Sequence, residues 1–515
     1  MSKLAKAAFI VLIMNLISRV LGFVRDAVIA KQFGASGATD AYLVAYTLPY
    51  SLQAILGVAF ATLVVPVVTG YLLRKEEEQG WKVVSSMLNG TTLLLTILTI
   101  LGMIFAPFLV RIMAPGFSGQ TVELTAHLSR IMFPSIIFMG TGMLLTGVLN
   151  AGKQFTIPAF APALANIIVI LAVLVFGAEY RVEGLAYGTL AGFVGFFLIQ
   201  IPNLRKINFR YHWVMNFQDP GVRSMIFAIV PMSLSISINQ ILLALNRFFA
   251  SHLTAGSITA LDFANRLMNL PLGIFAAAVS TAIFPAMAEG VAKKDFAALA
   301  QTVRKGLGMV TVAIVPAAIG LIVLKEPIVR LVFERGAFDA RATVLTSTSL
   351  LYFSLGLWFI AVNTILTRAF YAMQDLKSPL LLGLVSVVAD IVLSIILLPK
   401  MGHNGLALAN SLAAVLNMFQ LYWSLQLKVK GIGSKGLVKT TVVTFGASLA
   451  MGAVAVALYS GLGNWFGISQ LGNLINLTIT CTCSALLYVL LVLAFKIDEI
   501  QAFLAILKRK NKIAN

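Results

Sequence analysis

Long apolar stretches follow one another along the chain, with only short polar segments between them. Each holds about 20 or more residues, which is enough for a helix to cross the ~30 Å hydrocarbon core of a bilayer. We count about fourteen: 7–30, 38–72, 82–113, 123–151, 157–177, 184–204, 222–251, 257–288, 299–333, 343–373, 378–399, 404–427, 437–461 and 471–495. The pattern predicts an all-α polytopic membrane protein.

The pattern repeats itself halfway along the chain. Three pairs of positions recur at an offset of 222 residues: Arg25 and Arg247, Asp40 and Asp262, Pro49 and Pro271. Two longer motifs recur at an offset of 221: LTGVLNAGKQFTIP (145–158) as LTRAFYAMQDLKSP (366–379), and Gly-Leu-Ala at 184–186 and 405–407. Because each copy holds an even number of spans, both copies enter the membrane from the same side and are parallel repeats.

The repeat divides the chain into parts. We expect an N-terminal six-helix lobe at 1–206, its repeat at 221–430, two additional helices at 437–495 and a basic cytoplasmic tail at 496–515. Transporters built from two such repeats bind their cargo between the lobes and move the lobes to expose it on alternate sides of the membrane.

Composition agrees with a membrane protein, and the distribution of charge indicates its orientation. Apolar residues make up 59% of the chain and charged residues 11%, where a soluble domain holds about 25% charged residues. The formal net charge of +19 would suit nucleic acid, but most Lys and Arg fall in loops on one side of the predicted membrane. This bias fits the positive-inside rule with both termini in the cytoplasm. We expect contacts with anionic membrane lipids and none with nucleic acid.

Six arginines are expected to lie inside the membrane, away from the ends of the spans: Arg19, Arg25, Arg130, Arg247, Arg266 and Arg368. A guanidinium at the bilayer centre costs roughly 2.5–3.5 kcal/mol even on the insertion scale, so these side chains should face protein or water. Only four acids are expected inside the membrane with them: Asp26, Asp40, Asp262 and Asp390. The planar fork of arginine suits phosphate, because it offers paired donors and a permanent charge. The excess predicts a cationic cavity that binds an anionic cargo, with a diphosphate fitting best.

Several of these residues have both a structural and a cargo-binding interpretation. Asp26 could simply neutralise a neighbouring arginine. Asp40 and Asp262 stand near the starts of spans, where they could cap helices or pair with Arg25 and Arg247. We favour the structural role for both, with gating as the alternative.

Arg266 is favoured as a cargo ligand because only one repeat has it, the matching position in the other being Val44. Arg130 and Arg368 stay open between ligand, gate and, for Arg368, a side chain that reaches the membrane surface.

Nothing in the sequence predicts catalysis. The four histidines (His127, His212, His252 and His403) lack a second ligand or nucleophile at a suitable spacing, and the carboxylates show no metal-ligand spacing. We expect neither an enzyme nor a metal or cofactor site; the coupling ion or potential stays open.

Several long motifs are familiar: SRVLGFVRDAVIAKQFGASGATDAYLVAYTLP (18–49), APGF (114–117), GVLNAGKQFTIPAFAPALANI (147–167), FANRLMNLPLGIF (263–275), LVFERGAFDA (331–340) and RAFYAMQDLKSP (368–379). In this order they resemble the MurJ (MviN) family of lipid II flippases over essentially the whole chain. The resemblance implies the fold of the multidrug/oligosaccharidyl-lipid/polysaccharide exporter superfamily, with two six-helix lobes in a V around a cationic cavity.

The resemblance also implies a function and a location. The family moves undecaprenyl-diphosphate-linked peptidoglycan precursor, lipid II, to the outer leaflet of the bacterial cytoplasmic membrane. The last two helices would form a groove for the polyprenyl tail, and the cell-wall synthesis machinery would be a partner. Family positions for substrate binding match Arg19, Arg25, Asp26 and Arg266, and a further functional acid matches Asp40.

Two positions depart from the family pattern. Gram-negative relatives have an arginine shortly after the second-helix proline and a glutamate three residues after the eighth-helix arginine. This chain has Gln53 and Ala54 at the first place and Asn269 at the second. Arg130 and Arg368 are candidates to replace these charges.

Three alternatives to lipid II transport stay open at the level of sequence. The first is a flippase for another polyprenyl-linked saccharide, and the second is a cation-coupled drug exporter of the same fold. The arginine excess disfavours the drug exporter, since an organic cation would need carboxylates. The third is a non-transporting scaffold, which would have no use for arginines inside the membrane.

Overall fold

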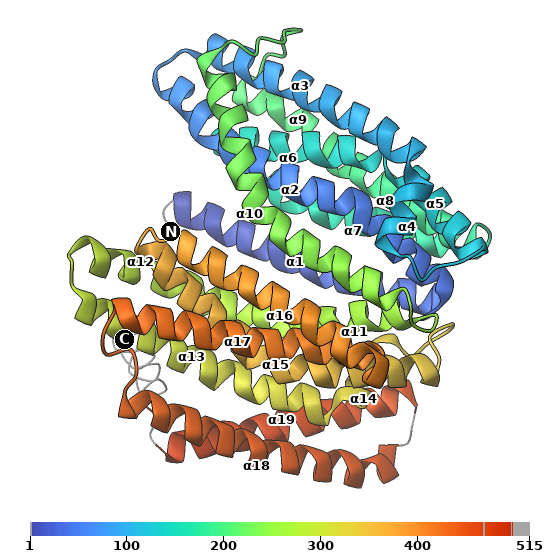
Figure 1. The fold of residues 1–515 in the computed structure, drawn as a ribbon, viewed down its shortest axis with the longest axis vertical. Helices are drawn as coiled ribbons and strands as arrows, with labels where there is room; N and C mark the ends of the chain where they lie inside the picture. Colours follow the sequence, from blue (N-terminus) through green and yellow to red (C-terminus); the bar gives the residue numbers. More distant parts are fainter. Residues whose placement is uncertain (1–2, 467–468, 496, 498–515) are drawn as a thin grey trace. The chain divides into compact units, whose positions relative to one another are not determined.

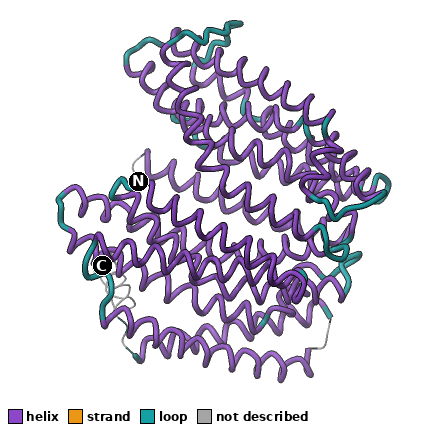
Figure 2. Tube along the Cα trace, viewed as in Figure 1, coloured by secondary structure: helices purple, strands orange, loops and turns teal. Residues whose placement is uncertain are grey.

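The computed structural model describes residues 3–466, 469–495 and 497, and in this part the chain forms helices and no strands (Figure 2). The basic tail expected at 496–515 lies outside the described residues, apart from Ile497. The chain divides into two compact units: unit 1 is Met1–Thr259 with Arg335–Asp339, and unit 2 is Ala260–Glu334 with Ala340–Asn515.

Unit 1 contains ten α-helices and one short 3₁₀ helix within the described residues. They are α1 (Lys3–Phe33), α2 (Gly37–Leu73), α3 (Glu77–Ile104), α4 (Ala106–Met113), α5 (Gln120–Met132), α6 (Ser135–Ala151), α7 (Thr156–Phe176), α8 (Arg181–Leu198), α9 (Ile201–Leu204), the 3₁₀ helix η1 (Arg205–Ile207) and α10 (Pro220–Ala250). Within the unit α2 packs on α5, α6 and α10, while α7 lies between α1 and α8 (Figure 1).

The core of unit 1 depends on close approach of α2 and α6. Phe60 and Val64 of α2 are buried against Leu144 and Val148 of α6. Gly147 allows this approach, because a Cβ atom there would lie 2.2 Å from Val64 Cγ1 and 2.6 Å from a backbone oxygen of α2. The small residue thus fixes the distance between two helices that both line the cavity described below.

Unit 2 contains the remaining described helices, although the first turn of α11 belongs to unit 1. They are α11 (Ser257–Pro271), the π-helical turn η2 (Leu272–Ala276), α12 (Ala277–Ala292), α13 (Phe296–Val323), α14 (Lys325–Phe333), α15 (Ala340–Ala372), α16 (Lys377–Met401), α17 (His403–Lys428), α18 (Lys435–Phe466) and α19 (Gln470–Ala494). Here α15 packs on α12, α13, α14 and α17, and α18 packs on both α13 and α19. Tyr488 of α19 donates a hydrogen bond to the Val312 carbonyl of α13 at 2.6 Å.

Twelve helical segments of the described chain are long and apolar enough to cross a membrane. Helices α1 and α10 are not among the twelve, but each has 31 residues, so the total is about fourteen. The all-α polytopic class predicted from the sequence is confirmed. Two predicted spans are divided: 82–113 at Phe105 between α3 and α4, and 123–151 at 133–134 between α5 and α6. The span 257–288 stays helical but passes through the π-helical turn after Pro271.

The predicted lobes 1–206 and 221–430, with the added pair at 437–495, stay a prediction. The structure groups α10 with unit 1, and it groups α18 and α19 with unit 2.

Candidate functional site

Arg25 of α1 stands in a polar cluster that joins two helices of unit 1. Its Nε and Nη2 donate to Asp26 Oδ1 at 3.1 and 2.9 Å, and its Nη1 donates to Asn166 Oδ1 on α7 at 3.0 Å. Asn166 in turn donates to the Ser18 carbonyl of α1 at 3.2 Å. The side chain of Asp26 is 5% exposed and that of Arg25 is 24% exposed. The ion pair is therefore sheltered, while the guanidinium keeps an accessible face.

That face belongs to a cavity inside unit 1. The cavity has a volume of about 310 Å³ and is lined by residues of α1, α2, α6, α7 and α8, Arg25 and Asn166 among them. Three tyrosines of α2 form a ladder along it, with ring centroids 6.0 Å apart for Tyr42–Tyr46 and 5.3 Å apart for Tyr46–Tyr50. Gln53, one turn further on, also lines the cavity. The cavity thus combines the guanidinium of Arg25 with tyrosine rings and the Gln53 amide. Together these groups can bind a hydrated or phosphate-bearing anion.

Asp40 of α2 does not line this cavity, and its side chain contacts the first turn of α11 within unit 1. Its Oδ2 accepts from the Gly256 amide at 2.6 Å, and its Oδ1 accepts from the amide and hydroxyl of Thr259 at 2.8 and 2.6 Å. The residue is 3% exposed. A carboxylate at a helix N-terminus satisfies amides that have no partner within the helix. Asp40 therefore caps α11 from α2; its role in gating stays a prediction.

Arg247 lies near the same turn. The residue is 6% exposed, and its Nη1 donates to the Ile258 carbonyl at 3.4 Å. Its positive charge acts on Asp40. Two residues of opposite charge thus contact the start of α11: Asp40 accepts from backbone amides, and Arg247 donates to a backbone carbonyl.

In unit 2, Arg266 pairs with the acid one turn before it. Arg266 Nε donates to Asp262 Oδ2 at 2.6 Å, and the two side chains are 29% and 14% exposed. The pair lies along one face of α11, as expected for residues four apart. Like Arg25, Arg266 combines a sheltered carboxylate with an accessible guanidinium.

Arg368 of α15 is held by α12. Its Nε donates to Ser280 Oγ at 3.0 Å, and its guanidinium carbon lies 5.5 Å from the ring centroid of Phe284. A cation over an aromatic face is attracted electrostatically. The contacts join the C-terminal end of α15 to α12 just beyond the π-helical turn.

Arg19 and Arg130 are the more exposed of the six arginines. Arg19 is exposed on α1, and Arg130 is exposed on α5, with its Nε donating to the Met103 carbonyl near the end of α3 at 3.2 Å. Whether they and the other arginines serve one cavity stays a prediction, as does the binding role of every residue described here.

Sequence reasoning missed Asn166 and the tyrosine ladder. Asn166 could have been found, because it is the one strongly polar residue in an otherwise apolar stretch of α7. The spacing of Tyr42, Tyr46 and Tyr50 also indicates one face of a helix, although not what that face meets. In the described part of the chain, no three His, Cys, Asp or Glu side chains gather in a way that could hold a metal ion.

Solved structures resemble this arrangement of helices. One titled "Lipid II flippase MurJ, inward closed conformation" has a TM-score of 0.80 and 27% sequence identity, covering 96% of this chain and 100% of its own. An inward-facing multidrug resistance MATE family transporter of the MOP superfamily has a TM-score of 0.68 at 15% identity, which speaks for the fold alone. The chain thus shares its fold with transporters of the MOP superfamily.

Sequence comparisons narrow the class to a family. The model of the family described as "Lipid II flippase MurJ" matches residues 29–476. The "Probable lipid II flippase MurJ" of Vibrio cholerae is 32% identical, covering 97% of this chain and 98% of its own. The "Lipid II flippase MurJ" of Burkholderia cenocepacia is 30% identical over 88% of each chain. The chain belongs to the MurJ family and is a multi-pass membrane protein.

Proposed function

We propose that this protein moves lipid II, the undecaprenyl-diphosphate-linked peptidoglycan precursor, from the inner to the outer leaflet of the bacterial cytoplasmic membrane. The observation that carries the proposal is the match of nearly the whole chain to proteins named lipid II flippases. The arginines supply the binding chemistry, because a diphosphate inside the membrane must be neutralised by permanent cations and the lipid hydrocarbon contains none.

The proposed binding step uses the guanidinium groups that combine shelter with access. Arg25 keeps its orientation through Asp26 and Asn166, and Arg266 through Asp262. Each carboxylate fixes its arginine before cargo arrives, so less side-chain entropy is lost on binding. Arg19, on the same helix as Arg25, is the third proposed ligand. Arg130, Arg247 and Arg368, with Asp40 and Asp262, are proposed to act in gating or support.

The proposed transport step is alternating access between the two sequence repeats, with both termini in the cytoplasm. The polyprenyl tail stays in lipid along α18 and α19, where exposed apolar side chains such as Leu449, Val456 and Leu486 are plentiful. Only the polar head group and its diphosphate then need the protein cavity. Cell-wall synthesis enzymes are proposed partners that supply and consume the cargo.

A second candidate is a flippase for another polyprenyl-linked saccharide, since the same arginines would bind any diphosphate. A drug exporter of this fold is less favoured, because Arg25 and Arg266 already engage the carboxylates beside them.

Complementation tests the proposal. The resident lipid II flippase of a bacterium is depleted, this chain is expressed, and exposure of lipid II on the outer surface is measured. Rescue by the wild type with loss in Arg25→Ala and Arg266→Ala supports lipid II flipping through these arginines. Arg341→Ala, an exposed arginine at the start of α15, is the matched control and should rescue fully.

Two other outcomes would change the proposal. Failure of a well-inserted wild type would favour a different polyprenyl cargo. Rescue by both arginine variants would leave the function in place and refute the binding step.

A further inference from the structure

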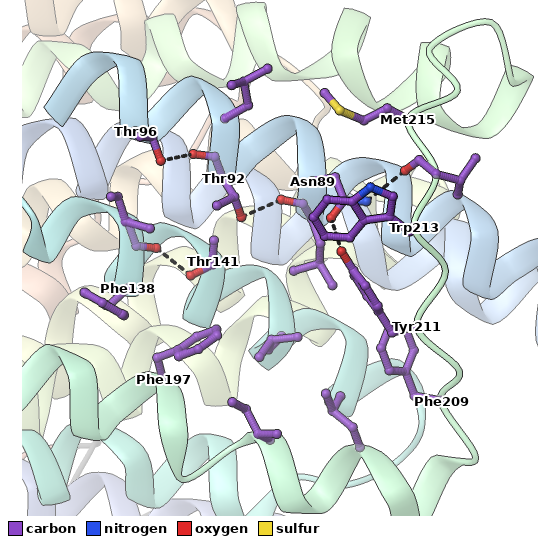
Figure 3. A pocket seen from close by; sticks show the side chains of 17 residues that line it. Asn89, Thr92, Thr96, Phe138, Thr141, Phe197, Phe209, Tyr211, Trp213 and Met215 are labelled. Carbon is purple, nitrogen blue, oxygen red and sulfur yellow. Dashed lines mark hydrogen bonds between the residues drawn. The ribbon is translucent and has the colours of Figure 1, made fainter. Parts of the chain in front are cut away.

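A second, larger cavity of unit 1 contains no residue of the arginine cluster. It has a volume of about 870 Å³ and is lined by α3, α6, the end of α8, α9 and the segment 209–215 (Figure 3). Along α3 it runs from Leu88 to Thr96, about 12 Å at the usual helical rise. This length is close to the ~15 Å depth of one leaflet, half of the hydrocarbon core. We call this cavity the leaflet groove.

The floor of the leaflet groove is apolar although it contains threonines. Thr92 donates its hydroxyl to the Leu88 carbonyl and Thr96 donates to the Thr92 carbonyl, both at 2.7 Å. Thr141 on α6 likewise donates to the Ile137 carbonyl. Because these hydroxyls are used within their own helices, they place little polarity in the groove. Phe138 and Phe197 complete the floor (Figure 3).

One end of the groove has the features of a membrane interface. The segment 209–215 is held on α3 by hydrogen bonds from Tyr211 to Asn89 at 2.6 Å and from Asn89 to the Val214 carbonyl at 2.9 Å. The residues Tyr211 and Trp213 are 50% and 91% exposed, and their rings meet edge to face at 6.1 Å. Exposed Trp and Tyr are typical of the level of lipid headgroups.

The same end is positively charged. Arg205 and Lys206 directly follow the lining residue Leu204, and Arg210 stands between the lining residues Phe209 and Tyr211. All three basic side chains are exposed. Glu78 at the start of α3 lies within the electrostatic reach of Arg210, but it already pairs with Lys82 at 2.8 Å. A net positive rim therefore adjoins an apolar groove.

We propose that the leaflet groove binds an anionic glycerophospholipid of the membrane, separately from the transported cargo. An acyl chain lies along α3 and α6 between Leu88 and Thr96, and the phosphate lies against Arg205, Lys206 and Arg210. A polyprenyl tail is several times longer than the groove, whereas an acyl chain has the length of one leaflet. The bound lipid would hold the segment 209–215, which connects the two sequence repeats, at a fixed depth in the membrane.

Photo-crosslinking tests the proposal on the full-length protein. The chain is reconstituted in vesicles that contain phosphatidylglycerol with a diazirine in one acyl chain, and labelled peptides are identified by mass spectrometry. Labels should concentrate on 88–96 and 137–145. A phosphatidylcholine probe with the same chains should label these peptides at least about fivefold less, since each basic side chain near an anionic lipid changes binding by about that factor.

Two variants and their matched controls make the test specific. Thr92→Trp fills the leaflet groove from an exposed lining position and should abolish the label, whereas Ile100→Trp, exposed on the same helix outside the groove, should leave it unchanged. The triple variant Arg205→Ala, Lys206→Ala, Arg210→Ala should reduce phosphatidylglycerol labelling to the phosphatidylcholine level. Removal of the exposed Lys305, Lys430 and Lys435 should not.

Three results would overturn the proposal. They are labels spread evenly over the exposed face of α3, equal labelling by both lipids, and loss of the label when polyprenyl phosphate is added at a low mole fraction. The last result would assign the groove to the cargo tail instead. None of these outcomes depends on whether the chain rescues lipid II transport, so this proposal and the proposed function can fail separately.

Discussion

Arg25 connects two helices through a geometry that only a guanidinium can supply. It donates from Nε and Nη2 to Asp26 and from Nη1 to Asn166. Lysine carries the same charge as a point, without the planar fork. We predict that Arg25→Lys lowers lipid II exposure in the complementation assay by about 10-fold or more, because one lost charge-assisted hydrogen bond is worth roughly 1.5–3 kcal/mol.

The prediction has a matched control in Arg341→Lys, which should keep full rescue. If Arg25→Lys behaved like the wild type at equal expression, charge alone would suffice and the fork would be irrelevant.

Asp40 makes a prediction about stability rather than transport. Its two oxygens accept three hydrogen bonds from Gly256 and Thr259. In Asp40→Asn the new amide group must replace one oxygen, so a donor faces a donor at a buried site. We predict a loss of about 1.5–3 kcal/mol in unfolding free energy, seen as a lower melting temperature in detergent. Glu123→Gln, at an exposed position of α5, should melt like the wild type; an equal melting temperature for Asp40→Asn would contradict the capping role.

At the residue scale, the charged residues inside the spans could be found from the sequence, but the side chains that contact them mostly could not. The pair Asp262–Arg266 follows from a spacing of four on one helix. The contact of Arg368 with Ser280 joins positions 88 apart, and the contact of Arg25 with Asn166 joins positions 141 apart. Periodicity predicts the face on which a residue lies but not which helix meets that face. For this reason Asn166 was missed although its own helix was predicted.

At the scale of elements, two glycines differ in the space around them, and substitutions there test how closely the helices pack. Gly147 of α6 has no space for a side chain against α2, whereas Gly320 of α13 has nothing within 4 Å. We predict that Gly147→Ala destabilises by about 1–3 kcal/mol through overpacking. Gly320→Ala should instead be neutral or stabilise by up to about 1 kcal/mol, since alanine favours helix. Thermal unfolding of both variants checks this, and equal shifts in the same direction would show that helix propensity alone explains them.

The start of α16 gives a prediction about pH. Asp375 accepts hydrogen bonds from Lys428 and from the amide and hydroxyl of Ser378. The hydrogen bond from Lys428, followed by those from Ser378, lowers the pKa of Asp375 from 3.8 to about 2. A lowered pKa stabilises the folded state above the unfolded value, and this contribution is lost as pH falls through about 2.

Comparison with Asp375→Asn measures that contribution. The difference in melting temperature between the wild type and the variant should be constant from about pH 8 to about pH 5, then shrink from about pH 4 to about pH 2. Lys428→Met removes the main partner and should weaken the same pH dependence. A difference that stays constant down to about pH 2 would contradict the shifted pKa.

The lengths of apolar stretches predicted the spans well, because the membrane sets a minimum helix length. Prolines indicated possible bends, but the sequence did not show which of them divide a span. Pro134 divides α5 from α6, yet Pro49 and Pro66 lie inside the continuous helix α2. A proline removes one backbone donor wherever it occurs, and the surrounding packing decides whether the helix ends or continues. The sequence alone does not contain that packing.

At the scale of the whole molecule, the sequence repeat predicts two equivalent halves, but the equivalence does not extend to chemistry. Gly147 in one copy matches Arg368 in the other at the offset of 221, and Val44 matches Arg266 at the offset of 222. In the first copy the small residue serves close packing of α2 on α6, whereas the arginine of the second reaches Ser280 and Phe284. The two sequence copies thus place cations at different positions, and these two belong to the second copy alone.

The charge of the cargo leads to a prediction for the complete protein in a sealed vesicle. Moving one negative charge outward along an interior-negative potential gains about 2.3 kcal/mol per 100 mV. A diphosphate with two charges would gain about 4.6 kcal/mol, reduced by any arginine that moves with it. We predict that an imposed interior-negative potential accelerates flipping of lipid II from the inner leaflet, and that an interior-positive potential slows it. Flipping rates from reconstituted vesicles with potassium and valinomycin measure both. If the flipping rate did not depend on the potential, bound arginines would neutralise the cargo charge throughout the transport step. Another source of energy would then have to drive transport.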